Sequence, residues 1–500
     1  MTKKYFYILI CLCVLKNVNA QNSKRPNIIL FIIDDMGWMD SSVPFGDSLG
    51  SLNKQFKTPN LMLLAKQGVK FTNAYVNPVC TPTRTSILTG MNVTHHGVTN
   101  WTSPVKDNST DAIDGQFNPA TWNLNGVNID SITTYPQLLK QSGYYTIHVG
   151  KAHWGPTGTP LSNPLNLGFM VNIAGHAAGH PQSYYGKDNY GNIPGKSTYQ
   201  SVPDLSNYYG TDTNLTEALT IEALKSLEEP IRLKMPFYLN MSHYAVHVPI
   251  QPDIRFYQSY LDEGLDTAKA KYASMVASMD KSLGDLMQFL SKKNIANNTI
   301  IIFMSDNGGL SLSGARGAVA HIQNLPLRAG KGSMYEGGIR VPMIVKWPQI
   351  VKDNSSNHQY IIAEDVFPSI LEMAGISRFK TIQKIDGKSF VPILKNSISI
   401  DTIRVLVWHY PNKWIEGDGP AINYKSAIRQ GNWKLIYDLR TGQKEMYNLK
   451  DDIGENYNLI HSNSAKARQL TILLKNVLDK NNAPMPSFKK NAKKVEINID

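Results

Sequence analysis

The stretch Asn27-Ile28-Ile29-Leu30-Phe31-Ile32-Ile33-Asp34-Asp35 decides the fold class. Residues 27–33 form an almost continuous apolar run, without the alternation of apolar and polar residues that marks a half-exposed strand. Such a run is typical of a strand buried on both faces, in a mostly parallel sheet covered by helices. Four similar runs follow, at residues 144–149, 237–241, 299–304 and 342–345. We therefore predict a central, mostly parallel sheet.

Helical patterns lie between these predicted strands. Residues 60–67 and 272–290 carry apolar side chains at the spacing of an amphipathic helix. Alternating strands and helices predict an α/β domain over residues 24–394, with helices flanking the sheet.

The pattern changes near residue 400. Four short strand-like segments separated by turns occupy residues 405–408, 424–429, 433–437 and 445–448. Residues 464–478 then have the pattern of an amphipathic helix. We predict a smaller C-terminal subdomain over residues 400–480, made of an antiparallel sheet and a helix, followed by a flexible basic tail at 481–500.

The composition of the 500 residues is that of a globular protein, with 42% hydrophobic and 18% charged residues. A disordered chain would be poorer in apolar residues. Three cysteines are too few for a disulfide-stapled scaffold or a cysteine-rich zinc module. The net charge of +12 suits an enzyme acting on a polyanion, but lysine richness also serves solubility alone.

The N-terminus has the pattern of a secretory signal peptide at residues 1–20. Lys3 and Lys4 precede an apolar run at 5–15, and Ala20 is a small residue at the expected cleavage point. The alternative is a hydrophobic helix retained in the fold. Cleavage would remove two cysteines and leave only Cys80. We expect an exported protein, periplasmic or secreted, without stable membrane insertion.

Two predicted strands end in oxygen-bearing side chains, Asp34-Asp35 and Asp306-Asn307. Ligands of open α/β sheets bind at the carboxyl ends of strands. Carboxylate and amide oxygens suit a divalent cation such as Ca²⁺ or Mg²⁺. The alternative is a pair of unrelated turns, because Asp-Asn-Gly is common turn chemistry.

The segment around Cys80 carries the strongest functional signal. Pro82 stands where a helix would begin and Gly90 where it would end, which places Cys80 at a helix N-terminus with Arg84 one turn on. Both features favour an anion near Cys80. The same features would activate a thiolate in a cysteine hydrolase.

Cys80, Pro82 and Arg84, followed by Leu88-Thr89-Gly90, resemble the signature of the formylglycine-dependent sulfatases, with Thr83 where many members carry serine. The resemblance continues in order along nearly the whole chain. The matching segments are 25–27 with 34–37, 58–60 with 68–75, 150–155, 247–249, 306–308, 330–342, 386–387 and 447–459. Two departures are the displaced tryptophan at Trp154 and Val246 in place of a proline.

The resemblance implies an alkaline-phosphatase-like fold and hydrolysis of a sulfate ester. A maturation enzyme would oxidise Cys80 to formylglycine (3-oxoalanine), whose hydrate attacks sulfur. One divalent cation, Ca²⁺ by family analogy with Mg²⁺ as the alternative, would neutralise the sulfate. Its implied ligands are Asp34, Asp35, residue 80, Asp306 and Asn307.

The resemblance also assigns the remaining site residues. Lys331 and His247 would face the ester oxygen, and one of them would protonate the departing alcohol. His153 would take a proton from residue 80 and so release sulfate. Arg84 and Lys151 would hold the diol and the sulfate oxygens. Taken singly, each of these residues has a structural alternative, such as a solvated lysine or a buried histidine.

The expected substrate is a sulfated carbohydrate, a poly- or oligosaccharide, and no nucleic acid partner is expected. His176, His180 and Tyr184 are candidates for a sugar subsite, although their segment could equally be a lid loop. Three alternatives remain open. The protein could be a phosphodiesterase or phosphonate hydrolase of the same superfamily, a cysteine hydrolase, or a non-catalytic sulfoglycan-binding protein if Cys80 is unmodified.

Overall fold

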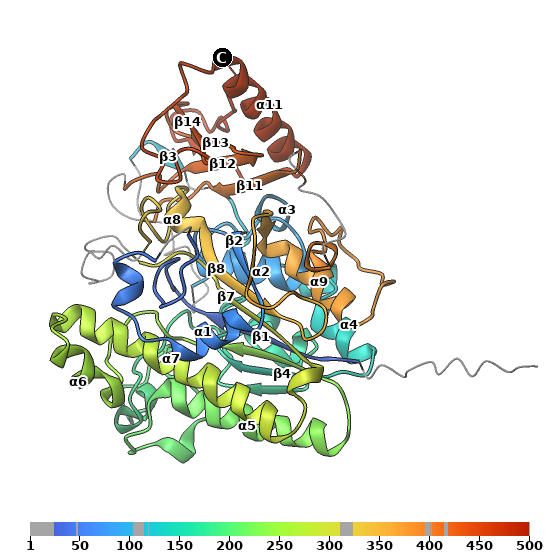
Figure 1. The fold of residues 1–500 in the computed structure, drawn as a ribbon. Coiled ribbons are helices and arrows are strands. Elements are labelled where there is room, and N and C mark those ends of the chain that lie inside the picture. The colour runs from blue at the N-terminus through green and yellow to red at the C-terminus, as the bar shows by residue number, and fades with distance from the viewer. Residues whose placement is uncertain are drawn as a thin grey trace, which may run out of the picture.

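The computed structural model describes residues 25–46, 49–103, 115–118, 120–310, 324–395, 401, 403–414 and 419–499. The predicted signal peptide lies outside these residues. Within them, a large sheet forms the centre of the molecule and a smaller sheet lies at its C-terminal end (Figure 1).

The central sheet has the strand order β10-β2-β8-β7-β1-β6-β4-β5, with β9 paired to β2. Its strands are β1 (Asn27–Ile33), β2 (Val69–Tyr75), β4 (Tyr145–Gly150), β5 (Val171–Ile173), β6 (Phe237–Ser242), β7 (Thr299–Ser305), β8 (Arg340–Lys346), β9 (Ser355–Asn357) and β10 (Ile361–Ile362). Every residue of β1, β6 and β7 is buried, as their unbroken apolar runs predict. Only β8 runs antiparallel to its two neighbours, so the sheet is mostly parallel, as predicted.

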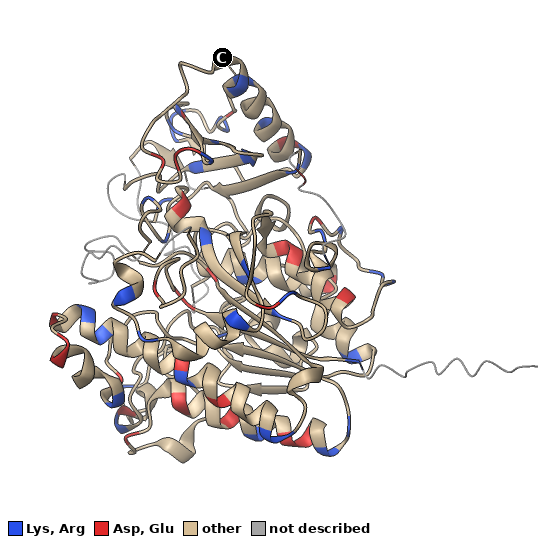
Figure 2. Ribbon diagram, viewed as in Figure 1, with Lys and Arg blue, Asp and Glu red and all other residues tan. Residues whose placement is uncertain are grey.

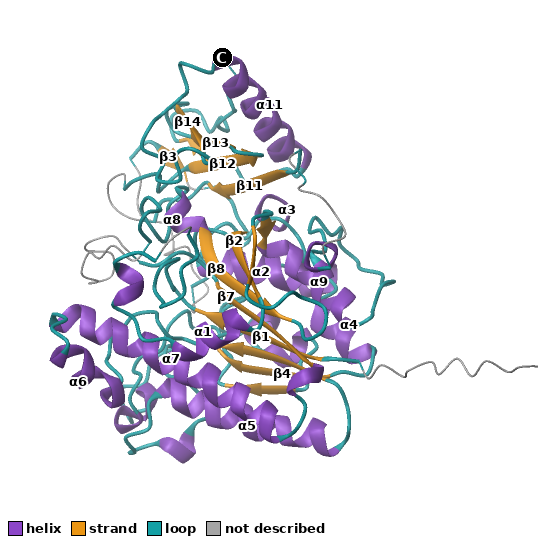
Figure 3. Ribbon diagram, in the orientation of Figure 1, coloured by secondary structure: helices purple, strands orange, loops and turns teal. Residues whose placement is uncertain are grey.

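Helices cover both faces of this sheet (Figure 3). Ile29, Phe31 and Ile33 of β1 pack in one apolar cluster with residues of α1 (Pro59–Lys66), α5 (Leu215–Arg232) and α7 (Thr267–Lys292). The alternate β1 residues pack in a second cluster with α2 (Cys80–Thr89), α4 (Tyr135–Gln141) and α9 (Val366–Met373). The remaining helices of this part are α3 (Val93–His96), α6 (Ile254–Asp262), α8 (Glu336–Ile339) and α10 (Val391–Leu394). This layering confirms the predicted α/β class.

The C-terminal sheet is antiparallel, in the order β11-β12-β13-β14. It consists of β11 (Val405–Tyr410), β12 (Lys425–Gln430), β13 (Trp433–Asp438) and β14 (Lys444–Asn448), and α11 (Ser464–Lys480) packs on it. Each predicted element of this part is therefore present.

The structure differs from our expectation of a flexible tail at 481–500. Within that segment β15 (Ser487–Phe488) pairs with β3 (Phe117–Asn118), and Val495 and Ile497 are buried in the apolar cluster under α11. The expectation rested on the lysine-rich composition of this segment and overlooked Val495 and Ile497, whose burial holds the segment against the C-terminal subdomain.

Charged side chains of both signs are interspersed along α5 and α7, where the helices face solvent (Figure 2). None of the helices in the described part of the chain combines the length and apolar character needed to cross a membrane.

Candidate active site

The predicted site residues meet at one edge of the central sheet. Parallel β1 and β7 end side by side, with Ile33 opposite Ser305, so Asp34-Asp35 and Asp306-Asn307 emerge together. Neighbouring β6 and β4 end at the same edge and lead into His247 and Lys151. Because β8 is antiparallel, its amino end also lies here and brings the preceding Lys331 segment. The residues that the strand-end rule singles out therefore lie together at one edge of the sheet.

The acidic residues form a buried cluster whose oxygens are only partly paired. Asn307 donates its Nδ2 to Asp35 Oδ1 at 2.7 Å, and the Asp35 backbone N–H donates to Asp306 Oδ1 at 3.3 Å. Asp34 Oδ1, Asp35 Oδ2 and Asn307 Oδ1 have no hydrogen-bond partner among the described residues. Ligand atoms of Asp34, Asp35 and His247 lie within 4.8 Å of one another. Converging buried oxygens of this kind fit a hard divalent cation.

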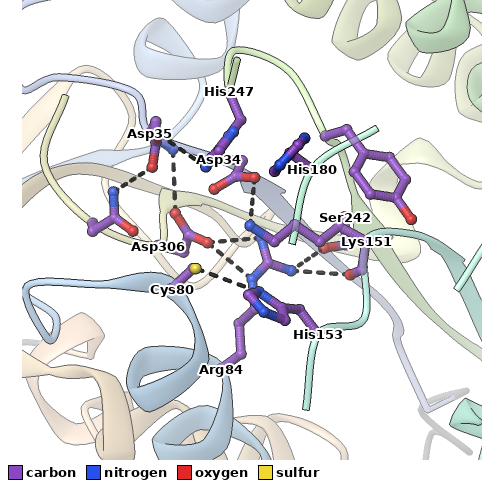
Figure 4. A network of polar contacts seen from close by, with 12 residues as sticks. Asp34, Asp35, Cys80, Arg84, Lys151, His153, His180, Ser242, His247 and Asp306 are labelled. Atoms are coloured by element: carbon purple, nitrogen blue, oxygen red, sulfur yellow. Dashed lines mark hydrogen bonds and ion pairs between the residues drawn. The ribbon is translucent and has the colours of Figure 1, made fainter. Parts of the chain in front are cut away.

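Two basic side chains cross the cluster toward these acids (Figure 4). Lys151 donates its Nζ to Asp34 Oδ2 at 2.6 Å, and both side chains are fully buried. Arg84 donates Nε to Asp306 Oδ2 at 2.9 Å and Nη1 to Ser242 Oγ at 2.6 Å. The guanidinium is thereby fixed in direction, since its fork geometry is satisfied by partners on two strand ends.

Cys80 is the first residue of α2, and Gly90 ends that helix with a φ of 69°, as the sequence predicts. The buried Sγ lies 3.4 Å from His153 Nδ1, and His153 Nε2 lies 2.9 Å from the carbonyl oxygen of Thr102. His153 and Asp35 both hold positive φ angles, 55° and 61°. Such backbone is costly for non-glycine residues and is concentrated at functional sites.

Lys331 and His247 meet at the carboxylate of Asp35. Lys331 Nζ donates to Asp35 Oδ1, and His247 Nε2 lies 3.5 Å from Asp35 Oδ2. Both side chains are almost completely buried. The structure thus brings together all the predicted catalytic and metal residues around Asp34, Asp35 and Cys80.

Burial and neighbouring charges shift the pKa values of the residues in this cluster in opposing directions. Burial and the charge of Asp306 raise the pKa of Asp34 well above its usual range, although Lys151 acts against them. Burial acts to raise the pKa of Asp306 as well, but Arg84, Lys151 and Lys331 together hold it below its ordinary value. Burial and the charge of Lys151 lower the pKa of His153, which keeps its imidazole neutral.

The three candidates for a sugar subsite occupy different positions. His180 stacks on His247, with ring centroids 5.4 Å apart and planes 5° apart. His176 is held by Tyr244, whose hydroxyl lies 2.9 Å from its Nδ1, and burial lowers the pKa of His176 to about 4. Tyr184 is 1% exposed and donates its hydroxyl to the carbonyl oxygens of Tyr244 and His247. In this position Tyr184 supports the His247 backbone, whereas His180 contacts the His247 ring itself.

Sequence reasoning missed two residues that shape the site. Ser242 fixes Arg84, and the Thr102 carbonyl fixes His153. Ser242 is the last residue of β6, so the strand-end rule could have found it. The contact of Thr102 depends on a loop that carries no signal in the sequence.

The mostly parallel sheet, with Cys80 at a helix N-terminus beside buried acidic and basic groups, is the arrangement of the alkaline-phosphatase-like fold of similar solved structures. The family model described as Sulfatase matches residues 26–376. A second model, described as N-sulphoglucosamine sulphohydrolase, C-terminal, matches residues 329–483. The chain belongs to the sulfatase family, and it is an enzyme of that family.

Similar proteins agree with this assignment. A sulfatase of Formosa agariphila is 30% identical over 95% of this chain and 92% of its own length. Human N-acetylgalactosamine-6-sulfatase is 29% identical over 74% of this chain and 66% of its own. The crystal structure of Ps i-CgsB in complex with k-i-k-neocarrahexaose has a TM-score of 0.73 at 27% identity, covering 92% of this chain and 94% of that one.

Proposed function

We propose that this sulfatase removes sulfate from a sulfated carbohydrate, an oligo- or polysaccharide, with residue 80 as formylglycine and one bound divalent cation. The observation that carries the proposal is the position of Cys80, at the N-terminus of α2 and 3.4 Å from His153 Nδ1, beside the partly paired acidic cluster. The carbohydrate class is supported by the sulfated sugar in the name of the human relative and by the oligosaccharide bound to Ps i-CgsB.

The cation would be held by the acidic cluster and residue 80. Asp34, Asp35 and Asn307 each offer a buried oxygen without a hydrogen-bond partner among the described residues, and Asp306 lies beside them. Ca²⁺ is the favoured ion and Mg²⁺ the alternative. When bound, the ion supplies positive charge that polarises a sulfate oxygen.

The chain's own residues would orient the sulfate and the nucleophile. Oxidation of Cys80 by a maturation enzyme supplies an aldehyde whose hydrate is a better nucleophile than a buried thiol. Arg84 pairs with Asp306 and Lys151 with Asp34 in the same buried cluster, and their fixed positive charges would offset the negative oxygens of a sulfate monoester. His153, next to residue 80, is placed to take a proton from it.

The departing alcohol would receive its proton on the opposite side of the cluster. Lys331 and His247 both contact Asp35 there, and either can donate a proton to an ester oxygen. We include export, directed by residues 1–20, in the proposal.

The decisive test is mass analysis of the peptide containing residue 80, in protein co-produced with a maturation enzyme, together with sulfate release. We expect formylglycine at position 80, and we expect Cys80→Ala to abolish sulfate release while the thermal melting temperature is retained. Thr83→Ser is the matched control, because serine keeps the hydroxyl that bonds to the Asn77 and Val79 carbonyls. It should keep both the modification and the activity.

Three results would contradict the proposal. An unmodified thiol in active enzyme would favour a cysteine hydrolase, and an unmodified thiol in inactive protein that binds sulfated sugar would favour a binding protein. Faster turnover of an aryl phosphate than of the matching aryl sulfate would favour a phosphoesterase.

A further inference from the structure

An aromatic side chain from the C-terminal part of the chain reaches the edge of the active site. Trp414 follows β11, and its backbone N–H donates to Asn423 Oδ1 at 2.7 Å, which fixes the start of the side chain. The indole is half-buried. It packs against Leu310 together with Val248, and it also packs against the apolar cluster that contains Val79 and Met334.

The contacts of Trp414 lie next to the leaving-group residues. Val248 directly follows His247, and Gly332 directly follows Lys331. A Cβ placed on Gly332 would lie 2.2 Å from Cζ3 of Trp414, so only glycine admits the indole so close to the backbone. Gly332 also has a φ of 86°, which favours glycine independently.

The backbone under the indole is tied to the rest of the site. Gly332 N–H donates to the Pro78 carbonyl at 2.8 Å, two residues before Cys80. Lys331 N–H donates to the Gly309 carbonyl at 3.1 Å, beside Leu310. The position of the indole is therefore fixed relative to the nucleophile, the acidic cluster and Lys331.

We propose that the indole of Trp414, supported by the buried Leu310 and flanked by Val248, forms the apolar surface on which the sugar ring bearing the sulfate packs. The inference rests on the proposed function and names a specificity-determining residue for it. A pyranose ring presents C–H groups on its faces, and a rigid indole supplies a large apolar contact at little cost in conformational entropy.

The location of the indole separates recognition of the sugar from recognition of the sulfate. Arg84, Lys151 and His153 gather around Cys80, whereas Trp414 contacts the segments that carry Lys331 and His247. The alcohol released at those two residues would leave from beside the indole. Loss of the indole should therefore weaken binding of the sugar and leave binding of inorganic sulfate unchanged.

The test compares Trp414→Ala and Trp414→Phe with wild-type enzyme carrying formylglycine. The substrates are N-acetylgalactosamine 6-sulfate and the k-i-k-neocarrahexaose, and inorganic sulfate serves as a competitive inhibitor. For the better substrate we expect Trp414→Ala to lower kcat/KM at least about tenfold, mainly through KM, with Trp414→Phe restoring most of it. The Ki of inorganic sulfate should stay within about twofold of wild type in both variants.

A matched control is Trp347→Ala. Trp347 is also a half-buried tryptophan, but it follows the far end of β8, away from the site edge. Trp347→Ala should lower the stability of the protein without lowering kcat/KM for the sulfated sugar as Trp414→Ala does.

The outcomes separate this inference from the proposed function. If wild type desulfates one of these sugars and Trp414→Ala does so equally well, the inference fails and the proposed function stands. If Trp414→Ala raises the Ki of inorganic sulfate as much as KM, the indole acts only by supporting Gly332, and the inference also fails. If wild type releases sulfate from an aryl ester but from no sulfated sugar, the proposed substrate class and the inference fail together.

Discussion

Two clusters of buried charge in this protein differ in how completely their oxygens are paired. The site cluster comprises Asp34, Asp35 and Asp306 with Arg84, Lys151 and Lys331. The interface cluster joins the central domain to the C-terminal sheet and comprises Glu336, Arg340, Lys434 and Glu455. In the interface cluster Glu336 Oε1 accepts from Lys434 at 2.8 Å, and Oε2 accepts from the Tyr75 hydroxyl at 2.6 Å. In the site cluster Asp34 Oδ1 and Asp35 Oδ2 lack a hydrogen-bond partner within the described chain, whereas in the interface cluster Glu455 Oε1, which also lacks a hydrogen bond, keeps an ion pair with Lys434 at 2.9 Å.

Glu336 and Asp34 also differ in their electrostatics. Burial acts to raise the pKa of Glu336, but Lys434 and Arg340 outweigh it and hold that pKa at about 2. Burial, with repulsion from Asp306, raises the pKa of Asp34 although Lys151 acts against it, and burial likewise raises the pKa of Glu455 in the interface cluster to about 7. A cluster that serves structure pairs its charges within the chain. A cluster that serves chemistry keeps oxygens for a ligand, and mutations should affect the two differently.

The largest expected effect is on activity, from Asp34→Asn in the site cluster. The substitution keeps the shape of the side chain but removes one negative charge from the proposed cation site. We expect sulfate release to fall about a hundred- to a thousandfold, measured as kcat on an aryl sulfate. If the variant keeps activity within tenfold of wild type, Asp34 is not a ligand of the proposed cation.

Cation binding supplies the control for this variant. Adding Ca²⁺ to chelator-treated wild type should raise the melting temperature, since a ligand at a hundred times its Kd stabilises by about 2.7 kcal/mol. Asp34→Asn should show a much smaller rise at the same concentration. An equal rise in both proteins would place the cation elsewhere.

The second prediction concerns stability, from Lys434→Met in the interface cluster. Lys434 is fully buried between Glu336 and Glu455, at 2.8 and 2.9 Å. Its removal leaves two buried carboxylates facing each other, which should cost about 3–5 kcal/mol in the free energy of unfolding. The folded fraction should lose far less activity than Asp34→Asn does.

Lys425→Met is the matched control, measured by the same urea titration. Lys425 also lies in the C-terminal sheet and pairs with Asp438, but the two side chains are 10% and 14% exposed, whereas Lys434 and its two partners are fully buried. Partial contact with solvent weakens the pair, so its loss should cost less. If both variants lose the same free energy of unfolding, the interface cluster contributes no more to stability than the Lys425–Asp438 pair does.

The sequence predicts the placement of the acidic residues of the site cluster better than the placement of its basic residues. Asp34 and Asp306 follow unbroken apolar runs, and parallel neighbouring strands bring their carboxyl ends together. The direction of β8 has no such signal, because an apolar run reads the same in either direction. It is the antiparallel course of β8 that places the Lys331 segment at the site edge.

Contacts between distant parts of the chain were not predictable from local patterns. Glu336 lies in a segment that matches the family, and Lys434 lies in a predicted strand, yet their pairing depends on how the two sheets dock. The same holds for Trp414, which reaches Gly332 only because the C-terminal sheet packs beside the site. The hydrophobic periodicity of a segment predicts which face of the helix or strand is buried, but it does not predict which other element packs against that face.

The last prediction is an effect that grows gradually with pH, from a third buried acid, Glu364, which accepts a hydrogen bond from Asn92 Nδ2 at 2.7 Å. Burial, with repulsion from Asp365, raises its pKa from the ordinary 4.5 to about 8. Between these two pH values the folded state keeps a proton that the unfolded state has released, so the contribution of Glu364 to stability is lost as pH rises. The slope for one proton is at most about 1.4 kcal/mol per pH unit.

Glu364→Gln keeps the acceptor for Asn92 and removes the titration, so the stability of this variant relative to wild type should rise from pH 5 to pH 8 in urea unfolding. A constant difference between the two proteins over that range would mean that Glu364 is ionised in the folded state, paired like Glu336 in the interface cluster.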